Sequence, residues 1–91
     1  MSRYSIGANF ERRVLAWLRE QNYYAVRTAG SHSITDIIAL KAGEILLIQC
    51  KTGGYLSPNE KMQLIELAAE NKCQAVLAKK DGKNIEMVRL N

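Results

Sequence analysis

The sequence has few of the residues that build thiolate, redox or membrane sites. Its 91 residues include two cysteines, one histidine and one proline, and aromatic residues make up 7%. Cys50 and Cys73 belong to no C-x-x-C or histidine-associated pattern, so zinc and redox motifs are unsupported and we expect both to be core thiols. No apolar run approaches the roughly 20 residues that cross a bilayer, and the N-terminus lacks the apolar region of a signal peptide. We therefore expect a cytoplasmic, intracellular protein that makes no membrane contact.

What is present fits one well-packed domain. A chain of this length buries roughly 60–70% of its unfolded surface, so we expect residues 1–91 to form a single domain. The hydrophobic content of 47% and the charged content of 24% are those of an ordinary globular protein, which argues against disorder. The formal net charge of +4 and the pI near 9.3 favour a negatively charged partner, and nucleic acid is the usual one.

Hydrophobic spacing and turn residues predict seven elements in the order αβββαββ. A first helix would be capped by Ser5 or Asn9, and a second would have Ser57 as N-cap, Pro58 at its first position and Glu60 completing a capping box. The apolar run at residues 45–48 indicates a central strand that is covered on both sides. The predicted helices span about residues 5–21 and 57–71, and the predicted strands span residues 23–27, 36–40, 44–51, 74–79 and 84–90.

The second and third strands form a predicted hairpin whose polar residues meet at one end. If residues 41–44 form the loop, Leu40 faces Ile45, and counting back along both strands places Asp36 opposite Gln49 on the same face. Lys51 joins them, because it lies two residues further along its strand. A register shifted by one residue would point the Asp36 carboxylate into apolar packing, so the hairpin register is itself a prediction.

Asp36, Gln49 and Lys51 together suit metal-assisted hydrolysis of a phosphodiester. Oxygen ligands hold Mg²⁺, which bridges to phosphate, and a lysine ammonium steadies the attacking hydroxide or the charge that develops on phosphorus. The pattern D-x12-Q-x-K is loose, and the alternative is that these polar strand ends simply face solvent. Glu11 lies at the edge of the apolar stripe of the first helix. It is either a first-turn residue favoured by the helix dipole or a member of the site.

A longer string of motifs resembles the archaeal-type Holliday junction resolvases of the PD-(D/E)XK nuclease superfamily. The helix glutamate is followed by V-R-T-A-G-S, D-I-I-A, I-Q-C-K and the Y-L-S-P-N-E opening of the second helix. The resemblance implies a restriction-endonuclease-like fold of the α/β (α+β) class, with a central mixed five-stranded sheet flanked by helices. It also implies a Mg²⁺-dependent endonuclease, with Mn²⁺ as a substitute, that cleaves branched DNA and above all Holliday junctions in recombination and repair.

The resemblance also implies roles for particular residues. Carried over residue by residue, the catalytic positions of the family fall on Glu11, Ser31, Asp36, Gln49 and Lys51. The implied metal ligands are Asp36, Gln49 and the backbone carbonyl of Cys50, with Glu11 acting through a water. His32 is interpreted as a loop residue or an outer hydrogen-bonding group rather than a base, because lysine and metal already provide activation.

Two features depart from the family pattern. The family glutamate is Gln49 here, so the site keeps an oxygen donor but loses one negative charge and should bind metal more weakly. The chain is also shorter than typical cellular resolvases and resembles the compact versions that viruses and phages carry. A less selective flap or duplex nuclease of the same superfamily therefore stays open as an alternative, of the kind found among virus-type replication-repair nucleases. A junction-binding module silenced by Gln49 stays open too.

The partner implied by the resemblance is branched DNA, contacted mostly at phosphates, and no nucleotide cofactor is expected. Family resolvases are homodimers, because a four-way junction needs two symmetric cuts. Arg27, immediately before the expected loop that starts at Thr28 and contains A-G-S, is the leading phosphate contact. Gly53-Gly54-Tyr55 either lets a flexible loop approach the strand being cut or is a plain connector. The further DNA-binding candidates are Arg3, Arg12, Arg13, Lys61 and Tyr55.

Overall fold

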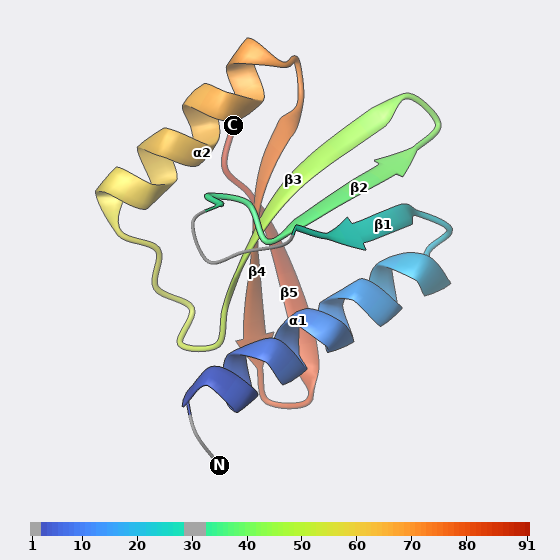
Figure 1. Cartoon of the computed structure of the whole chain (residues 1–91), viewed down its shortest axis with the longest axis vertical. Coiled ribbons are helices and arrows are strands. Elements are labelled where there is room, and N and C mark those ends of the chain that lie inside the picture. The colour runs from blue at the N-terminus through green and yellow to red at the C-terminus, as the bar shows by residue number, and fades with distance from the viewer. Residues whose placement is uncertain (1–2, 29–32) are drawn as a thin grey trace.

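The computed structural model describes residues 3–28 and 33–91, and at the start of the first helix it describes side chains from Ile6 onward. Two helices flank a five-stranded sheet in which the strands follow sequence order (Figure 1). β3 and β4 are parallel and the other neighbouring pairs are antiparallel, so the predicted mixed sheet and element order are confirmed. Over the described ranges, neither helix is long and apolar enough to cross a bilayer. The elements are α1 (Arg3–Glu20), β1 (Tyr24–Arg27), β2 (Ile37–Lys41), β3 (Glu44–Lys51), α2 (Pro58–Glu70), β4 (Gln74–Asp81) and β5 (Asn84–Arg89).

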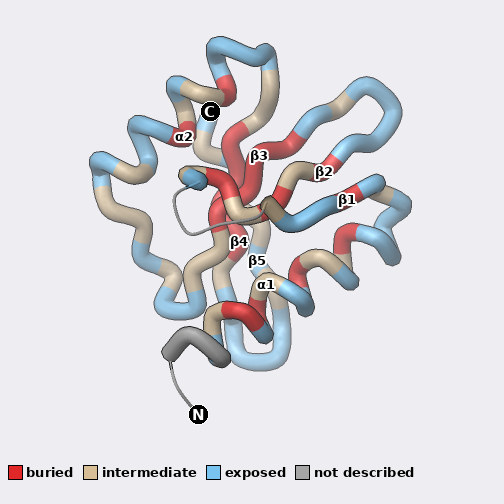
Figure 2. Tube along the Cα trace, in the orientation of Figure 1, coloured by how far each residue is buried: buried red, intermediate tan, exposed pale blue. Residues whose placement is uncertain are grey.

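Each helix covers one face of the sheet. On one face, the apolar stripe of α1 packs against Ala39 and Ile48. On the other face, Leu64 of α2 packs against Leu47 and Ala75. Because neighbouring residues of a strand point to opposite faces, β3 is covered on both sides and its centre is buried, as predicted (Figure 2).

The hairpin of β2 and β3 has the predicted register. Leu40 lies opposite Ile45 and Ile37 lies opposite Ile48, which leaves Asp36 one residue beyond the last pair and on the side of Gln49. The register shifted by one residue is therefore excluded.

The turn of this hairpin is shorter than predicted. Lys41 pairs with Glu44, so only Ala42 and Gly43 form the loop, with φ of 47° and 83°. Positive φ at both central residues is typical of a two-residue hairpin turn, whose twist matches that of the strands. The loop therefore spans two residues rather than the four of residues 41–44.

The start of α2 is the capping box that the sequence predicts. Ser57 is the N-cap in an extended conformation, its Oγ accepts from the N–H of Glu60 at 3.2 Å, and Pro58 occupies the first turn. The helix ends before Asn71, whose backbone N–H closes the last turn. These contacts are local, which is why the sequence alone predicts them.

The predicted start of α1 is wrong. The helix begins at Arg3, so Ser5 and Asn9 lie inside it and neither is the N-cap. Asn9 instead accepts a hydrogen bond at its Oδ1 from Arg12 Nη1, at 3.4 Å. An interior Ser or Asn costs a helix at most about 0.7 kcal/mol relative to Ala, so a residue suited to capping does not stop a helix from continuing upstream.

Replacing Leu64 tests how far the fold depends on docking of α2. Its side chain is 0% exposed, so Leu64→Ala should lower the free energy of unfolding by about 2–5 kcal/mol. Met62, on the same helix, is 60% exposed, and Met62→Ala should change stability by no more than about 0.5 kcal/mol. Urea unfolding followed by circular dichroism measures both variants. Equal losses would mean that α2 does not depend on this buried contact.

Candidate active site

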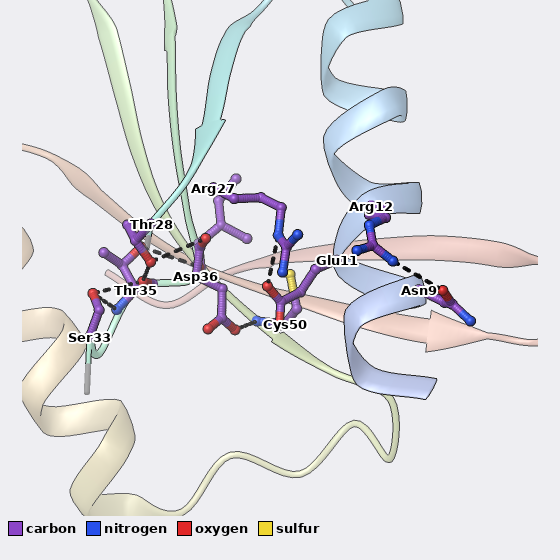
Figure 3. A network of polar contacts seen from close by, with 10 residues as sticks. Asn9, Glu11, Arg12, Arg27, Thr28, Ser33, Thr35, Asp36 and Cys50 are labelled. Atoms are coloured by element: carbon purple, nitrogen blue, oxygen red, sulfur yellow. Dashed lines mark hydrogen bonds and ion pairs between the residues drawn. The ribbon is translucent and has the colours of Figure 1, made fainter. Parts of the chain in front are cut away.

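Asp36 continues the β2–β3 ladder at the point where β2 has ended. The last paired residues are Ile37 and Ile48, whereas β3 continues to Lys51. The N–H of Asp36 donates to the carbonyl of Ile48 at 2.7 Å, and Asp36 Oδ2 accepts from the N–H of Cys50 at 2.9 Å (Figure 3). The carboxylate is therefore fixed at the open edge of β3, in the place that a further strand residue would take.

The backbone carbonyl of Cys50 faces the same open edge. Alternate residues of a strand direct their backbone groups to the same neighbour, so Cys50 shares the orientation of Ile48, which bonds Asp36. By the same alternation, the backbone groups of the intervening residue, Gln49, are expected to point away from β2 and toward β4. The N–H of Cys50 bonds the Asp36 carboxylate, and strand geometry predicts that the carbonyl of the same residue points to the same open edge.

Three hydroxyl side chains hold the segment before Asp36, and sequence reasoning missed them. Thr35 is buried, and its Oγ1 donates to the carbonyl of Ile37 at 2.9 Å. Thr28 Oγ1 and Ser33 Oγ donate to the carbonyl of Thr35 at 2.6 Å and 2.8 Å. The N–H of Thr28 also donates to the carbonyl of Asp36 at 2.9 Å. The sequence feature that could have predicted these bonds is the group of Ser and Thr residues before the strand, because such side chains commonly bond nearby backbone groups.

Glu11 joins this end of the sheet from α1. Its Oε1 lies 3.3 Å from Arg27 Nε, and Figure 3 shows the pair beside Asp36. Since α1 begins at Arg3, Glu11 lies beyond the first turn, and the interpretation as a first-turn residue favoured by the helix dipole is wrong. The structure instead brings the carboxylates of Glu11 and Asp36 within electrostatic reach of each other.

Burial is the main cause that raises the pKa of Asp36 above its ordinary value. The hydrogen bond from Cys50 opposes this rise, the charge of Glu11 adds to it, and the charges of Lys51 and Arg27 oppose it. Burial also raises the pKa of the Cys50 thiol, which therefore stays protonated. The ionised Asp36 carboxylate is thus held at a net electrostatic cost, which a bound cation would relieve.

Gln49 carries a buried acceptor that has no partner. Gln49 is 9% exposed. Among the described residues, its Oε1 is the one buried side-chain oxygen or nitrogen that makes no hydrogen bond. An unsatisfied buried acceptor costs about 1–3 kcal/mol. By the hairpin register, this oxygen belongs to the same face as Asp36, so the site contains an acceptor in need of a donor or a cation.

Lys51 reaches the edge of the site and pairs with α2. Its Nζ lies 2.9 Å from Glu60 Oε2, and both side chains are about one-third exposed. Lys51 shares its face of β3 with Gln49, two residues before it. Residues from α1, β3, α2 and the segment before β2 therefore meet at one end of the sheet.

The donors at this end of the sheet fit a hard divalent cation. Asp36 and Glu11 offer carboxylates, Gln49 offers an amide oxygen and Cys50 offers a carbonyl, which are the ligand types that Mg²⁺ and Ca²⁺ prefer. Within residues 3–28 and 33–91, no three His, Cys, Asp or Glu side chains gather into a metal-binding group. The unpartnered Gln49 Oε1 is the observation that fits an ion, because an ion would satisfy it.

The predicted DNA-binding residues are dispersed. Arg27 lies beside Asp36, whereas Arg12 is bonded to Asn9 and lies away from Asp36 (Figure 3). Arg13 donates from Nη2 to the carbonyl of Lys83 at 2.7 Å, in the turn between β4 and β5. Lys61 and Tyr55 are exposed. The predictions for Ser31, His32 and the side chain of Arg3 lie outside the described residues.

Comparison with known proteins identifies the family of this chain. The family model described as archaeal Holliday junction resolvase (Hjc) matches residues 2–91. The chain belongs to the archaeal Holliday junction resolvase family. It is 31% identical over 70 residues to crossover junction endodeoxyribonuclease Hjc of Methanocaldococcus jannaschii, a match that covers 72% of this chain and 52% of that protein. The chain thus spans about half the length of this curated relative.

A solved structure of this resolvase family has the same fold. The Holliday junction resolvase Hjc of Archaeoglobus fulgidus is similar with a TM-score of 0.83 and 28% identity, over 92% of this chain and 77% of that chain. The family resemblance and the fold class predicted from sequence motifs are therefore both confirmed.

The pKa of Asp36 gives this resolvase-family chain a testable pH dependence. A carboxyl group whose folded pKa is raised contributes stability below its unfolded pKa and loses that contribution as pH rises through the folded value. Asp36→Asn keeps an acceptor for the N–H of Cys50 but removes the charge. We expect the variant to be more stable than wild type at pH 7 in EDTA, with a difference that shrinks as pH falls towards 4. Urea unfolding across this range measures it, and a wild type more stable than the variant at pH 7 would contradict the account.

Proposed function

We propose that this chain is a metal-dependent endonuclease that hydrolyses phosphodiester bonds in branched DNA, with the Holliday junction as its main substrate. The observation that carries the proposal is the Asp36 carboxylate, fixed against the N–H of Cys50 at the open edge of β3 in a chain of the resolvase family. Glu11, Gln49 and Lys51 come to the same end of the sheet. Together they provide ligands for a cation and a positive charge for phosphate.

Membership of the family implies dependence on a divalent metal ion, and the proposal specifies Mg²⁺ with Mn²⁺ as a substitute. Asp36, Gln49 Oε1 and the Cys50 carbonyl would hold the ion, and Glu11 would contact it through a water. When bound, such an ion polarises a phosphoryl oxygen and lowers the pKa of a water molecule. The buried Gln49 oxygen without a partner and the destabilised Asp36 charge both support this assignment, since a cation stabilises each of them.

The side chains around the carboxylate have separate roles in the proposal. Lys51 places an ammonium where negative charge develops on the phosphate in the transition state. Glu11 holds the Arg27 guanidinium, which contacts a phosphate of the DNA strand. Ser31, also assigned to the catalytic set, comes five residues before Asp36 in the sequence.

DNA is held mainly through its phosphates, because a structure-specific nuclease need not recognise base edges. The net charge of +4 favours this mode of binding. The remaining assigned DNA contacts are Arg3, Arg12, Arg13, Lys61 and Tyr55.

A homodimer would supply the two cuts that a four-way junction requires. We assign its contact to an uncovered patch formed by Tyr24, Leu40 and Ile45. These residues lie opposite one another across β1, β2 and β3, with exposures of 69%, 41% and 36%. Among the described residues, α2 packs mainly on β3 and β4 of this face, and contiguous exposed apolar surface commonly marks an interface.

A DNA-binding module without catalytic activity is the second candidate, and Gln49 is the observation that favours it. The amide has no negative charge, so it attracts a cation less strongly than the glutamate of the family pattern would. Under this alternative the chain binds junctions tightly without cutting them, and Gln49→Glu restores cleavage.

Replacing Asp36 tests the nuclease directly. Asp36→Ala should lower the rate of four-way-junction cleavage in Mg²⁺ or Mn²⁺ by at least about a hundredfold, an effect expected for a group that stabilises transition-state charge. Junction binding should persist or tighten, because a negative charge near phosphate is removed. Gel-based cleavage and binding assays measure both quantities.

Asp81→Ala is the matched control, because it removes one carboxylate from the exposed last residue of β4 and should leave cleavage unchanged. Full activity of Asp36→Ala would refute the site. Absence of cutting by wild type on junction, flap and nicked duplex, in either metal, would refute the enzyme. Equal rates on a junction and on its linear arms would indicate the less selective nuclease.

Replacing Leu40 tests the assigned dimer contact. Leu40→Glu places a charge in the uncovered patch and should convert a dimer to a monomer in light scattering coupled to size-exclusion chromatography. Met62→Glu, which charges a more exposed apolar position on α2, should leave the dimer intact. Dissociation by Met62→Glu and not by Leu40→Glu would place the interface on α2 instead.

A further inference from the structure

The Glu60 carboxylate makes two different contacts, one with each oxygen. Its Oε1 lies 3.0 Å from Ser57 Oγ and 3.4 Å from the backbone nitrogen of Ser57, which completes the capping box of α2. Its Oε2 lies 2.9 Å from Lys51 Nζ. A residue whose local role is to begin a helix thus also holds the lysine of the proposed site, across the connection between β3 and α2.

The capping box lowers the entropic cost of this ion pair relative to an ordinary surface pair. A lysine has four rotatable bonds, and ordering two long side chains usually cancels much of the gain from pairing them. Here the capping box already fixes Glu60, so mainly the Lys51 side chain has to be ordered. The pKa of the Glu60 carboxyl lies below its usual range, with the hydrogen bond from Lys51 as the largest cause.

The charges around Lys51 show what the contact does. Asp36 and Lys51 belong to the same end of the sheet, and an unrestrained ammonium would pair with the Asp36 carboxylate and compete there with a cation. Gln49, two residues before Lys51 on the same face, has no charge with which to hold it. The carboxylate that pairs with Lys51 belongs instead to Glu60 of α2.

We propose that Glu60 is a positioning residue for Lys51. It supplies from α2 the negative charge that Gln49 does not supply from β3, and it keeps the ammonium apart from Asp36 and directed to the phosphate. The inference rests on the proposed nuclease function, because it concerns the same site.

Two variants separate this role from helix capping. Glu60→Gln keeps a capping box, because glutamine also serves at this position, but removes the charge that pairs with Lys51. Ser57→Ala removes the hydroxyl that caps the helix, but it keeps the backbone N–H that bonds Glu60 Oε1 and the contact of Glu60 Oε2 with Lys51. We expect Glu60→Gln to lower kcat for junction cleavage by about 10- to 100-fold, as is usual for the partner of an active-site group, with KM changed by less than about threefold. Ser57→Ala should lower Tm by about 4–8 °C and leave kcat within about twofold of wild type.

A second measurement does not depend on cleavage. In protein labelled with ¹⁵N-lysine, the Lys51 ammonium signal, assigned by its loss in Lys51→Met, should be ordered in wild type and in Ser57→Ala, and mobile in Glu60→Gln. Failure of wild type to cut DNA while this pattern holds would refute the nuclease and leave the pairing intact. An unchanged Lys51 signal in Glu60→Gln would refute the positioning role, as would a kcat equal to or above that of wild type.

Discussion

The hydrogen bond from the N–H of Cys50 to Asp36 Oδ2 is the contact on which the candidate site depends. This bond forms where β2 ends and β3 continues, so the Asp36 side chain accepts the hydrogen bond that a backbone carbonyl of β2 would otherwise accept. The hairpin register brings Asp36 to this place, and the buried Thr35 hydroxyl, bonded to the Ile37 carbonyl, holds the turn before it. A shift of one residue would turn the carboxylate to the opposite face. The geometry of the site is thus a consequence of how the sheet is paired.

Two polar groups of the candidate site, the Asp36 carboxylate and Gln49 Oε1, are poorly stabilised in the folded chain. Burial disfavours the charge of Asp36, and Gln49 Oε1 is enclosed without a donor. A bound cation would lower both of these free-energy costs. Functional sites commonly lower the stability of the free protein in this way. In the proposed positioning role, Glu60 pairs with Lys51 and so keeps that ammonium from forming an ion pair with Asp36 in place of a metal ion.

The sequence predicted features that depend on neighbouring residues. Apolar alternation and the requirement for a buried face determine the hairpin register, in which Leu40 lies opposite Ile45. The capping box that begins at Ser57 is complete within four residues. The prediction from sequence was wrong at the start of α1, where Ser5 and Asn9 are suited to capping but the helix begins at Arg3. The contact between Lys51 and Glu60 was also missed, because each residue has a sufficient local explanation and only the path of the chain from β3 into α2 brings them together.

The central claim is that an uncharged Gln49 completes a metal site around Asp36. Titration of Mn²⁺ followed by electron paramagnetic resonance, on wild type and Gln49→Leu, tests it directly. Leucine has a similar volume and no oxygen, so it removes the unsatisfied acceptor together with the proposed ligand. The account predicts that Gln49→Leu is at least as stable as wild type and binds Mn²⁺ about tenfold or more weakly. Equal Mn²⁺ affinity in the two proteins would contradict it.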